Sequence, residues 1–188
     1  MVNERGQSRT RLCRILHGCL CLIFLAFLLA GCSDDVSIGD NQGKPSGKVS
    51  DFSDCGGFNP AKTAIRPGSS QDCLEYQYDG KSVLTLHHID AGFNCCPGEI
   101  SADISFEGDT IGIVEKENFG TNGACHCLCL FDIDLRIDDL QPGKYFIRVG
   151  ELYLSEGDEP LEFEVDLSSS SSGSHCVSRN HYPWLEIQ

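Results

Sequence analysis

The sequence predicts an all-β protein whose folded part is a single antiparallel β-sandwich of about seven strands, stapled by disulfides. Segment 55–167 alternates apolar and polar residues with a period of two, and it sustains no 3.6-residue repeat. Turn signals built from glycine, proline and aspartate separate the alternating runs at short intervals. The 188 residues include 12 cysteines, a density that suits an exported domain cross-linked by disulfides.

Two hairpins are predicted in the first half of the sandwich. Asp79-Gly80 and Gly108-Asp109 are two-residue turn signals, because the turns that join twisted strands need positive φ at their central positions. The hairpins pair 73–78 with 81–89, and 99–107 with 110–116. One face of the strand at 99–107 carries only apolar residues, which are Ile100, Ala102, Ile104 and Phe106.

The strongest predicted strand runs from Cys125 to Ile137. Its odd positions form one face, with Cys125, Cys127, Cys129, Phe131, Ile133, Leu135 and Ile137. Its charged even positions are expected to face solvent, and they are Asp132, Asp134, Arg136 and Asp138. Two further strands are predicted, 144–154 behind a Pro142-Gly143 turn and an alternating run at 161–167.

The turn before 144–154 carries a family resemblance. Leu140-Gln141-Pro142-Gly143-Lys144-Tyr145 is similar to the L-x-P-G-x-Y corner of prealbumin-like and carboxypeptidase-regulatory-like domains. The resemblance implies a sandwich of the immunoglobulin or prealbumin type, in which the turn presents a tyrosine at the start of a core strand. It implies a fold and no activity, since such sandwiches serve many functions.

The N-terminus has the features of an export signal. Four arginines at positions 5, 9, 11 and 14 precede an apolar run from Cys19 to Ala30. As a helix this run would rise about 18 Å, too short for a hydrocarbon core of about 30 Å. The pattern therefore predicts a signal peptide at residues 1–31 rather than a transmembrane helix.

A second resemblance ends this segment. Leu29-Ala30-Gly31-Cys32 resembles the lipobox of bacterial lipoproteins. The resemblance implies cleavage just before Cys32 and attachment of a diacylglyceryl group to its thiol, which anchors such proteins to a membrane. Ser33 at the next position favours transfer to the outer membrane in these families. We therefore expect a lipid-anchored protein of the cell envelope, on the outer membrane and facing the periplasm or the cell surface.

The rest of the chain divides into a tether, the sandwich and a tail. Residues 32–54 are polar and rich in glycine and serine, which predicts a flexible tether before the domain at 55–167. Residues 168–188 begin with the serine-rich run 168–174, predicted as a linker. The tail after it contains Tyr182, Pro183 and Trp184, which either pack one aromatic ring on the sandwich or form a recognition patch.

Beyond the lipidated cysteine, an even number of cysteines predicts a disulfide framework, made of Cys55, Cys73, Cys95, Cys96, Cys125, Cys127, Cys129 and Cys176. Cys95 and Cys96 are too close to pair with each other, with Cα atoms about 3.8 Å apart. Extending the Gly108-Asp109 hairpin brings both of them near the strand that holds cysteines 125–129. We therefore expect at least one bridge there, and we expect Cys176 to pin the tail to the sandwich.

The alternative interpretation of these cysteines is a metal site. Cys95 and Cys96 facing Cys125, Cys127 and Cys129 would gather soft thiolates for zinc or copper, with His87, His88 or His126 as imidazole ligands. Against this interpretation, strand alternation places His126 on the other face of the strand from the three cysteines. It likewise places His87 and His88 on different faces of their strand. An oxidising compartment would also bridge the thiols before a metal arrived.

Composition and motifs favour a non-catalytic protein. The formal net charge of −14 opposes nucleic-acid binding, because phosphates attract lysine and arginine. The sequence contains no nucleophile-elbow, P-loop, zinc-protease or dinucleotide motif, and no cofactor is predicted. The acidic residues of 132–139 are interpreted as the solvent-exposed face of a strand rather than as a calcium site. We therefore expect no enzyme but a structural or binding module, with the membrane as its anchor and a protein or glycan of the envelope as its partner.

Overall fold

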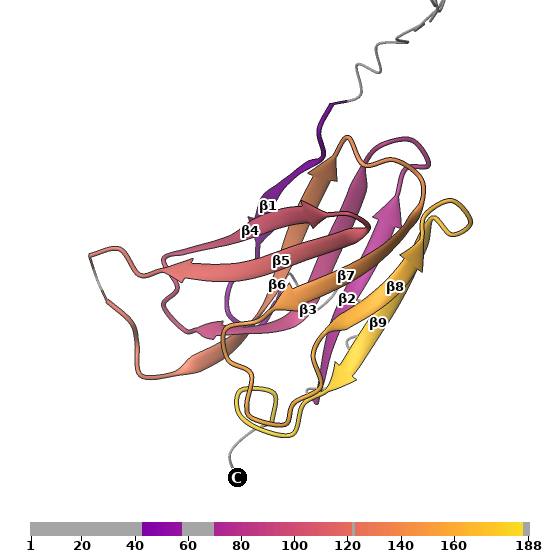
Figure 1. Cartoon of the computed structure of the whole chain (residues 1–188). Coiled ribbons are helices and arrows are strands. Elements are labelled where there is room, and N and C mark those ends of the chain that lie inside the picture. The colour runs from indigo at the N-terminus through magenta and orange to yellow at the C-terminus, as the bar shows by residue number, and fades with distance from the viewer. Residues whose placement is uncertain (1–42, 58–69, 122, 186–188) are drawn as a thin grey trace, which may run out of the picture. The chain divides into compact units, whose positions relative to one another are not determined.

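The computed structural model describes residues 43–57, 70–121 and 123–185. The predicted signal peptide, Cys32 and residues 33–42 of the predicted tether lie outside these residues. The described chain confirms the disulfide-stapled all-β sandwich, with nine strands in two sheets that lie one in front of the other (Figure 1). None of these residues belongs to a helix with the length and apolar character needed to cross a bilayer.

The larger sheet has five strands and the smaller has four. The first has the order β1-β6-β3-β2-β9, with β1 Ser46–Phe52, β6 Leu128–Asp138, β3 Leu84–Asn94, β2 Gln71–Tyr78 and β9 Ser172–Ser178. The second has the order β4-β5-β7-β8, with β4 Glu99–Glu107, β5 Thr110–Asn118, β7 Lys144–Gly150 and β8 Glu162–Asp166. All described strand pairs are antiparallel except β5 with β7, so the prediction of a wholly antiparallel sandwich is corrected at that pair.

The hairpin at Gly108-Asp109 is confirmed. Glu107 pairs with Thr110 across a two-residue loop, and the register continues unbroken to Glu99 opposite Asn118. Gly108 has a φ of 58°, the left-handed conformation that such a turn requires and that glycine adopts without a steric penalty.

The two-residue turn predicted at Asp79-Gly80 is wrong in its length. Tyr78 pairs with Leu84, so residues 79–83 form the connection. The Asp79 carboxylate explains the longer loop, because its Oδ1 accepts three backbone hydrogen bonds, from Lys81, Ser82 and Val83, at 2.8–3.0 Å. A short acidic side chain that satisfies several turn amides stabilises a wider loop than a tight turn.

Two segments predicted as tether and linker are strands at the edges of the larger sheet. Within the predicted tether 32–54, β1 pairs with β6. Within the predicted linker and tail 168–188, β9 pairs with β2 along its whole length. Both strands are poor in large apolar residues because an edge strand is held mainly by backbone pairing to its neighbour. That composition is the one that sequence patterns assign to linkers.

Strand β6 is shorter than predicted, and one of its acidic residues faces inward. It begins at Leu128, so Cys125 and Cys127 lie in the preceding loop. Phe131, Ile133, Leu135 and Ile137 are buried as predicted. Asp132 was expected to face solvent but is also buried, and its backbone N–H and side chain contact Ser53 and Asp90. Strand β7 likewise ends at Gly150, four residues before the predicted end.

The core lies between the two sheets and contains the predicted apolar faces. Ile100 from β4, Ile111 and Ile113 from β5, and Leu84 and Leu86 from β3 are all buried in it. The tyrosine of the L-x-P-G-x-Y turn is anchored locally, since the Tyr145 hydroxyl donates to the Gln141 carbonyl at 2.8 Å. The core also encloses charged side chains, which form the candidate site described next.

Candidate functional site

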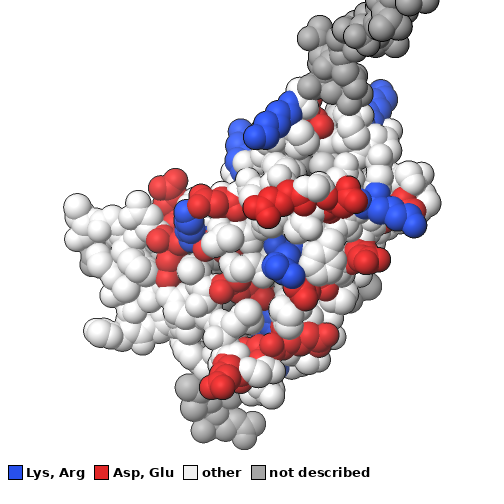
Figure 2. Space-filling model, viewed as in Figure 1, with Lys and Arg blue, Asp and Glu red and all other residues white. Residues whose placement is uncertain are grey.

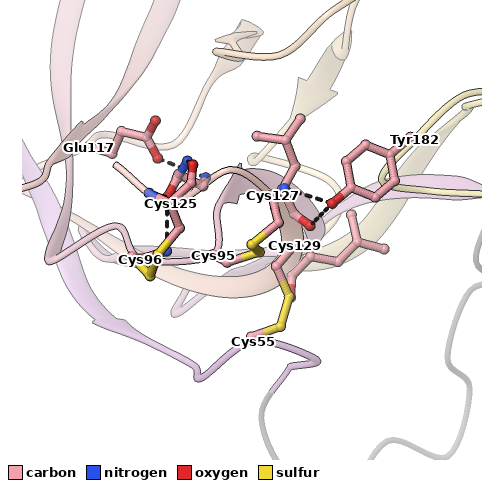
Figure 3. Close-up of a disulfide and its surroundings, with 11 residues drawn as sticks. Cys55, Cys95, Cys96, Glu117, Cys125, Cys127, Cys129 and Tyr182 are labelled. Atoms are coloured by element: carbon pink, nitrogen blue, oxygen red, sulfur yellow. Dashed lines mark hydrogen bonds between the residues drawn. A yellow bond between two sulfur atoms is a disulfide. The ribbon is translucent and has the colours of Figure 1, made fainter. Parts of the chain in front are cut away.

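All eight cysteines outside residues 1–32 are joined in four disulfides. The pairs are Cys55–Cys129, Cys73–Cys176, Cys95–Cys127 and Cys96–Cys125. Three of them gather at one end of the sandwich, where β3 leaves the sheet and β6 enters it (Figure 3). The fourth joins β2 to β9, which confirms that Cys176 attaches the C-terminal part of the chain to the sandwich and places the bridge in an edge strand.

Cys95 and Cys96 meet their partners for a different reason from the one the hairpin suggested. Asn94 pairs with Leu128 at the end of the β3–β6 ladder, and the Cys95 N–H donates to the Cys127 carbonyl at 3.0 Å. The Asn94 side chain links the two segments, because its Oδ1 accepts hydrogen bonds from the N–H groups of Cys96 and Cys125. Extending the β4–β5 register beyond its last pair would place Cys95 and Cys96 a few residues away from Cys125 and Cys127.

Two side chains from elsewhere in the chain brace this end (Figure 3). The Glu117 carboxylate accepts a hydrogen bond from the Asn94 N–H at 2.9 Å. The Tyr182 hydroxyl donates to the Leu128 carbonyl at 2.6 Å and accepts from the Leu128 N–H at 2.7 Å. The disulfide end is therefore fixed by covalent bonds and by hydrogen bonds from β5 and the C-terminal segment.

These pairs bear on the alternative metal site. All five cysteines proposed as ligands are in disulfides, and a disulfide sulfur is not the thiolate that binds zinc or copper. His126 lies exposed in the loop before β6. A thiolate site would require the bridges to be reduced first.

The most unusual chemistry lies inside the core, around His88. This imidazole is fully buried and lies between two carboxylates. Its Nε2 is 2.6 Å from Asp72 Oδ1, and its Nδ1 is 2.6 Å from Glu115 Oε1. Asp72 and His88 come from the larger sheet and Glu115 from the smaller, so these hydrogen bonds cross the sandwich.

Arg179 extends this network on the far side of Asp72. Its Nε lies 3.2 Å and its Nη2 3.1 Å from Asp72 Oδ2, and Nη2 also donates to Glu151 Oε2 at 2.7 Å. Its Nη1 donates to the Glu159 carbonyl at 2.7 Å. We call Asp72, His88, Glu115, Glu151 and Arg179 the buried charge network. Every one of its side chains is at most 3% exposed.

The pKa values in the network follow from burial and from these contacts. Burial lowers the pKa of His88, but the carboxylates of Glu115 and Asp72 together outweigh it and hold that pKa well above 6.5. Burial raises the pKa of Asp72, but His88, Glu151 and Arg179 outweigh it and hold it below 3.8. Burial, together with the neighbouring Asp72 carboxylate, raises the pKa of Glu151 to about 9. At neutral pH Glu151 therefore carries a proton beside an ionised Asp72.

Strand alternation explains how the strand residues of the network enter the core. Asp72 lies in the same inward row as Leu74, and His88 in the same row as Leu86. Glu115 continues the row of Ile111 and Ile113 on β5. A charged residue at an apolar position of an alternating strand is the signal that could have revealed the network. Sequence reasoning named only His88 among these residues.

The other sequence candidates are dispersed. His87 faces away from His88, as predicted, and its Nδ1 lies 2.6 Å from Asp134 Oδ1 at a partly exposed site. Asp138 pairs with Arg136, and Asp158 pairs with His181. Among the described residues, no three acidic side chains of 132–139 come close enough together to bind one ion. In the tail, Trp184 packs on the sandwich, where it is 1% exposed.

The described surface exposes hydrogen-bonding side chains in a groove of the larger sheet. An open groove of about 390 Å³ crosses β2, β3 and β9, and its lining includes Glu75, Gln77, Thr85 and His87. Figure 2 shows Asp and Glu spread over the viewed face, with few Lys and Arg between them. Such a surface suits contacts with a polar, uncharged partner or with a basic one.

Comparison of the chain with protein-family models, with curated proteins and with solved structures finds no match in any of the three.

Proposed function

We propose that this protein is a lipoprotein of the bacterial cell envelope, anchored through Cys32 to the outer membrane. Its disulfide-stapled β-sandwich acts as a non-catalytic structural or binding module.

The cysteine inventory is the observation that carries the proposal. Cleavage before Cys32 removes the cysteines at positions 13, 19 and 21 with the signal peptide. Eight of the remaining cysteines are in disulfides, which supports an oxidising compartment. One thiol is then left over in the mature chain, at the position that the lipobox resemblance assigns to the lipid.

Two further observations support a binding role over catalysis. The most perturbed titratable groups belong to the buried charge network, whose side chains are almost completely covered by the core. Substrate has no direct access to groups at that depth. By contrast, the β2–β3–β9 groove exposes polar side chains on a rigid sheet, an arrangement that suits hydrogen bonding to a glycan or a protein.

The test of the anchor is metabolic labelling with a radioactive fatty acid in a bacterial host, followed by membrane fractionation. We expect the exported chain to carry the label and to sediment with membranes. Cys32→Ala should abolish the label, whereas Cys13→Ala, inside the signal peptide, should leave it unchanged. Unlabelled protein in the soluble periplasmic fraction would contradict the proposal.

A further inference from the structure

We propose that Asp72, His88 and Glu151 form a binding site for one small divalent transition-metal ion, with Zn²⁺ as the best fit. The site lies inside the sandwich and uses none of the cysteines. It is independent of the lipid anchor and of the module's partner.

The first observation is the convergence of three ligand types. One ligand atom from each of Asp72, His88 and Glu151 lies within 4.8 Å of the other two. Within the described residues, no other group of three metal-ligating side chains meets this condition. Two carboxylates and one imidazole are donors that zinc uses in proteins, and the imidazole favours zinc over calcium or magnesium.

The second observation is that the outer atoms of these side chains are already held in place. Glu115 binds His88 Nδ1, which leaves Nε2 directed at Asp72. Arg179 binds Asp72 Oδ2 and Glu151 Oε2, so these contacts do not engage Asp72 Oδ1 and Glu151 Oε1. A carboxylate behind a histidine and a partner behind each ligating carboxylate are the outer contacts that orient metal ligands.

The third observation concerns Glu151 Oε1. It is the buried side-chain polar atom that accepts no hydrogen bond from the described residues, although its side chain is only 3% exposed. A buried oxygen without a donor is costly, so such an atom calls for a proton or a cation beside it. In the metal-free protein the proton on Glu151 fills this role, and a bound metal ion would take its place.

Charge and spacing are compatible with a dication. The network holds three carboxyl groups, one guanidinium and one imidazole. With all three carboxylates ionised and His88 neutral, the charge of a divalent ion together with that of Arg179 would balance the three negative charges. Two ligands of a tetrahedral zinc lie about 3.4 Å apart, given bonds of about 2.0–2.2 Å. Asp72 Oδ1 and His88 Nε2 are 2.6 Å apart. The ion would therefore replace the hydrogen between them and move them apart by less than about 1 Å.

A proton network without metal is the competing interpretation, and one experiment separates the two. The exported full chain, extracted in detergent with its disulfides intact, is stripped with EDTA and dialysed against Zn²⁺. The zinc content of each chain is then measured. As a second readout, Co²⁺ replaces Zn²⁺ and its absorption is recorded. Glu151→Gln removes one ligand charge and keeps the side-chain shape. Asp134→Asn is the matched control, because it disrupts a histidine–carboxylate pair at the surface.

We expect one Zn²⁺ per chain, with an affinity at least about 10-fold lower in Glu151→Gln and unchanged in Asp134→Asn. Glu115→Gln keeps an oxygen that accepts from His88 Nδ1 but removes the negative charge behind the imidazole, and it should weaken binding by about 10–100-fold. Because the site is closed, urea unfolding is also compared in Zn²⁺ and in EDTA, so that slow entry cannot conceal binding. Zinc should raise the urea midpoint of the parent chain by clearly more than that of Glu151→Gln, because weaker binding stabilises the folded state less. Absence of stoichiometric zinc, or an equal zinc effect in both chains, would overturn the proposal.

Discussion

The guanidinium carbon of Arg179 lies 5.6 Å from the centre of the Trp184 ring, so the indole covers the outer side of the buried charge network. The Trp184 Nε1–H donates to the Asp90 carbonyl at 2.7 Å. A side-chain carbon at Gly92 would lie 2.8 Å from the indole, so glycine is needed there for the ring to fit. The C-terminal segment therefore completes the core rather than trailing from it.

Loss of the Trp184 ring should be strongly destabilising. Trp184→Ala removes a buried aromatic side chain and exposes Arg179, so we expect a loss of about 3–5 kcal/mol in the free energy of unfolding. Leu185→Ala, at a 37% exposed neighbour, should change it by less than about 0.5 kcal/mol. Urea unfolding followed by circular dichroism measures both, since the first variant lacks the chain's single tryptophan. Similar losses in the two variants would argue against the packed indole.

Removal of the Arg179 charge should also destabilise the fold. Arg179→Met leaves Asp72 and Glu151 buried without their guanidinium, and breaking a buried ion pair in this way costs about 3–5 kcal/mol. Arg148→Met breaks an exposed pair with Glu162 and should cost at most about 1 kcal/mol. Both are measured by urea unfolding in EDTA. If the two variants lost equal stability, the buried pairs would not contribute as described.

Alternation was sufficient to predict the strands with apolar faces. The hairpin at Gly108-Asp109 and the inward row of β6 from Phe131 to Ile137 were predicted because each residue there obeys a local pattern. The edge strands β1 and β9 were not predicted, because their stability comes from backbone pairing with β6 and β2. No local composition encodes that pairing.

Most of the candidate site could not be predicted from the sequence, for a similar reason. Its members lie on β2, β3 and β5 and after β7 and β9, and only the sheet order brings them together. Glu115 in the row of Ile111 and Ile113 was a readable local signal. Glu151 and Arg179 lie just beyond strand ends, where alternation carries no information about burial.

The stability of the metal-free protein should decrease from mildly acidic to alkaline pH. The folded-state pKa of Glu151, about 9, exceeds its ordinary value of 4.5, so its contribution is full below 4.5 and is lost as pH rises through about 9. The raised pKa of His88 acts in the same direction above 6.5. Asp72, with a lowered pKa, contributes above 3.8 and loses that contribution as pH falls through its folded-state pKa.

Urea midpoints between pH 5 and 9 in EDTA test this expectation. The parent chain should show a falling midpoint, and Glu151→Gln should show a flatter profile because glutamine has no proton to lose. Glu162→Gln, at the surface, should follow the parent. A parent profile that rises over this range would contradict the assigned protonation states.

The disulfide pattern predicts both a mass change and an uneven contribution to stability. Complete reduction of four bridges should add about 8 Da to the intact mass. Proteolysis without reduction should release Cys73 joined to Cys176, and Cys55 joined to Cys129. Replacing both Cys73 and Cys176 by serine opens a loop with a sequence separation of 103 and should cost about 2–5 kcal/mol.

The matched control for that variant is the double serine replacement of Cys96 and Cys125, which opens a sequence separation of only 29. Because the entropy removed from the unfolded chain grows with loop length, this second variant should lose less stability. The Asn94 hydrogen bonds to both segments also remain in it. A larger loss from the 96–125 pair would mean that the disulfide end, rather than the β2–β9 edge, depends more on its covalent bonds.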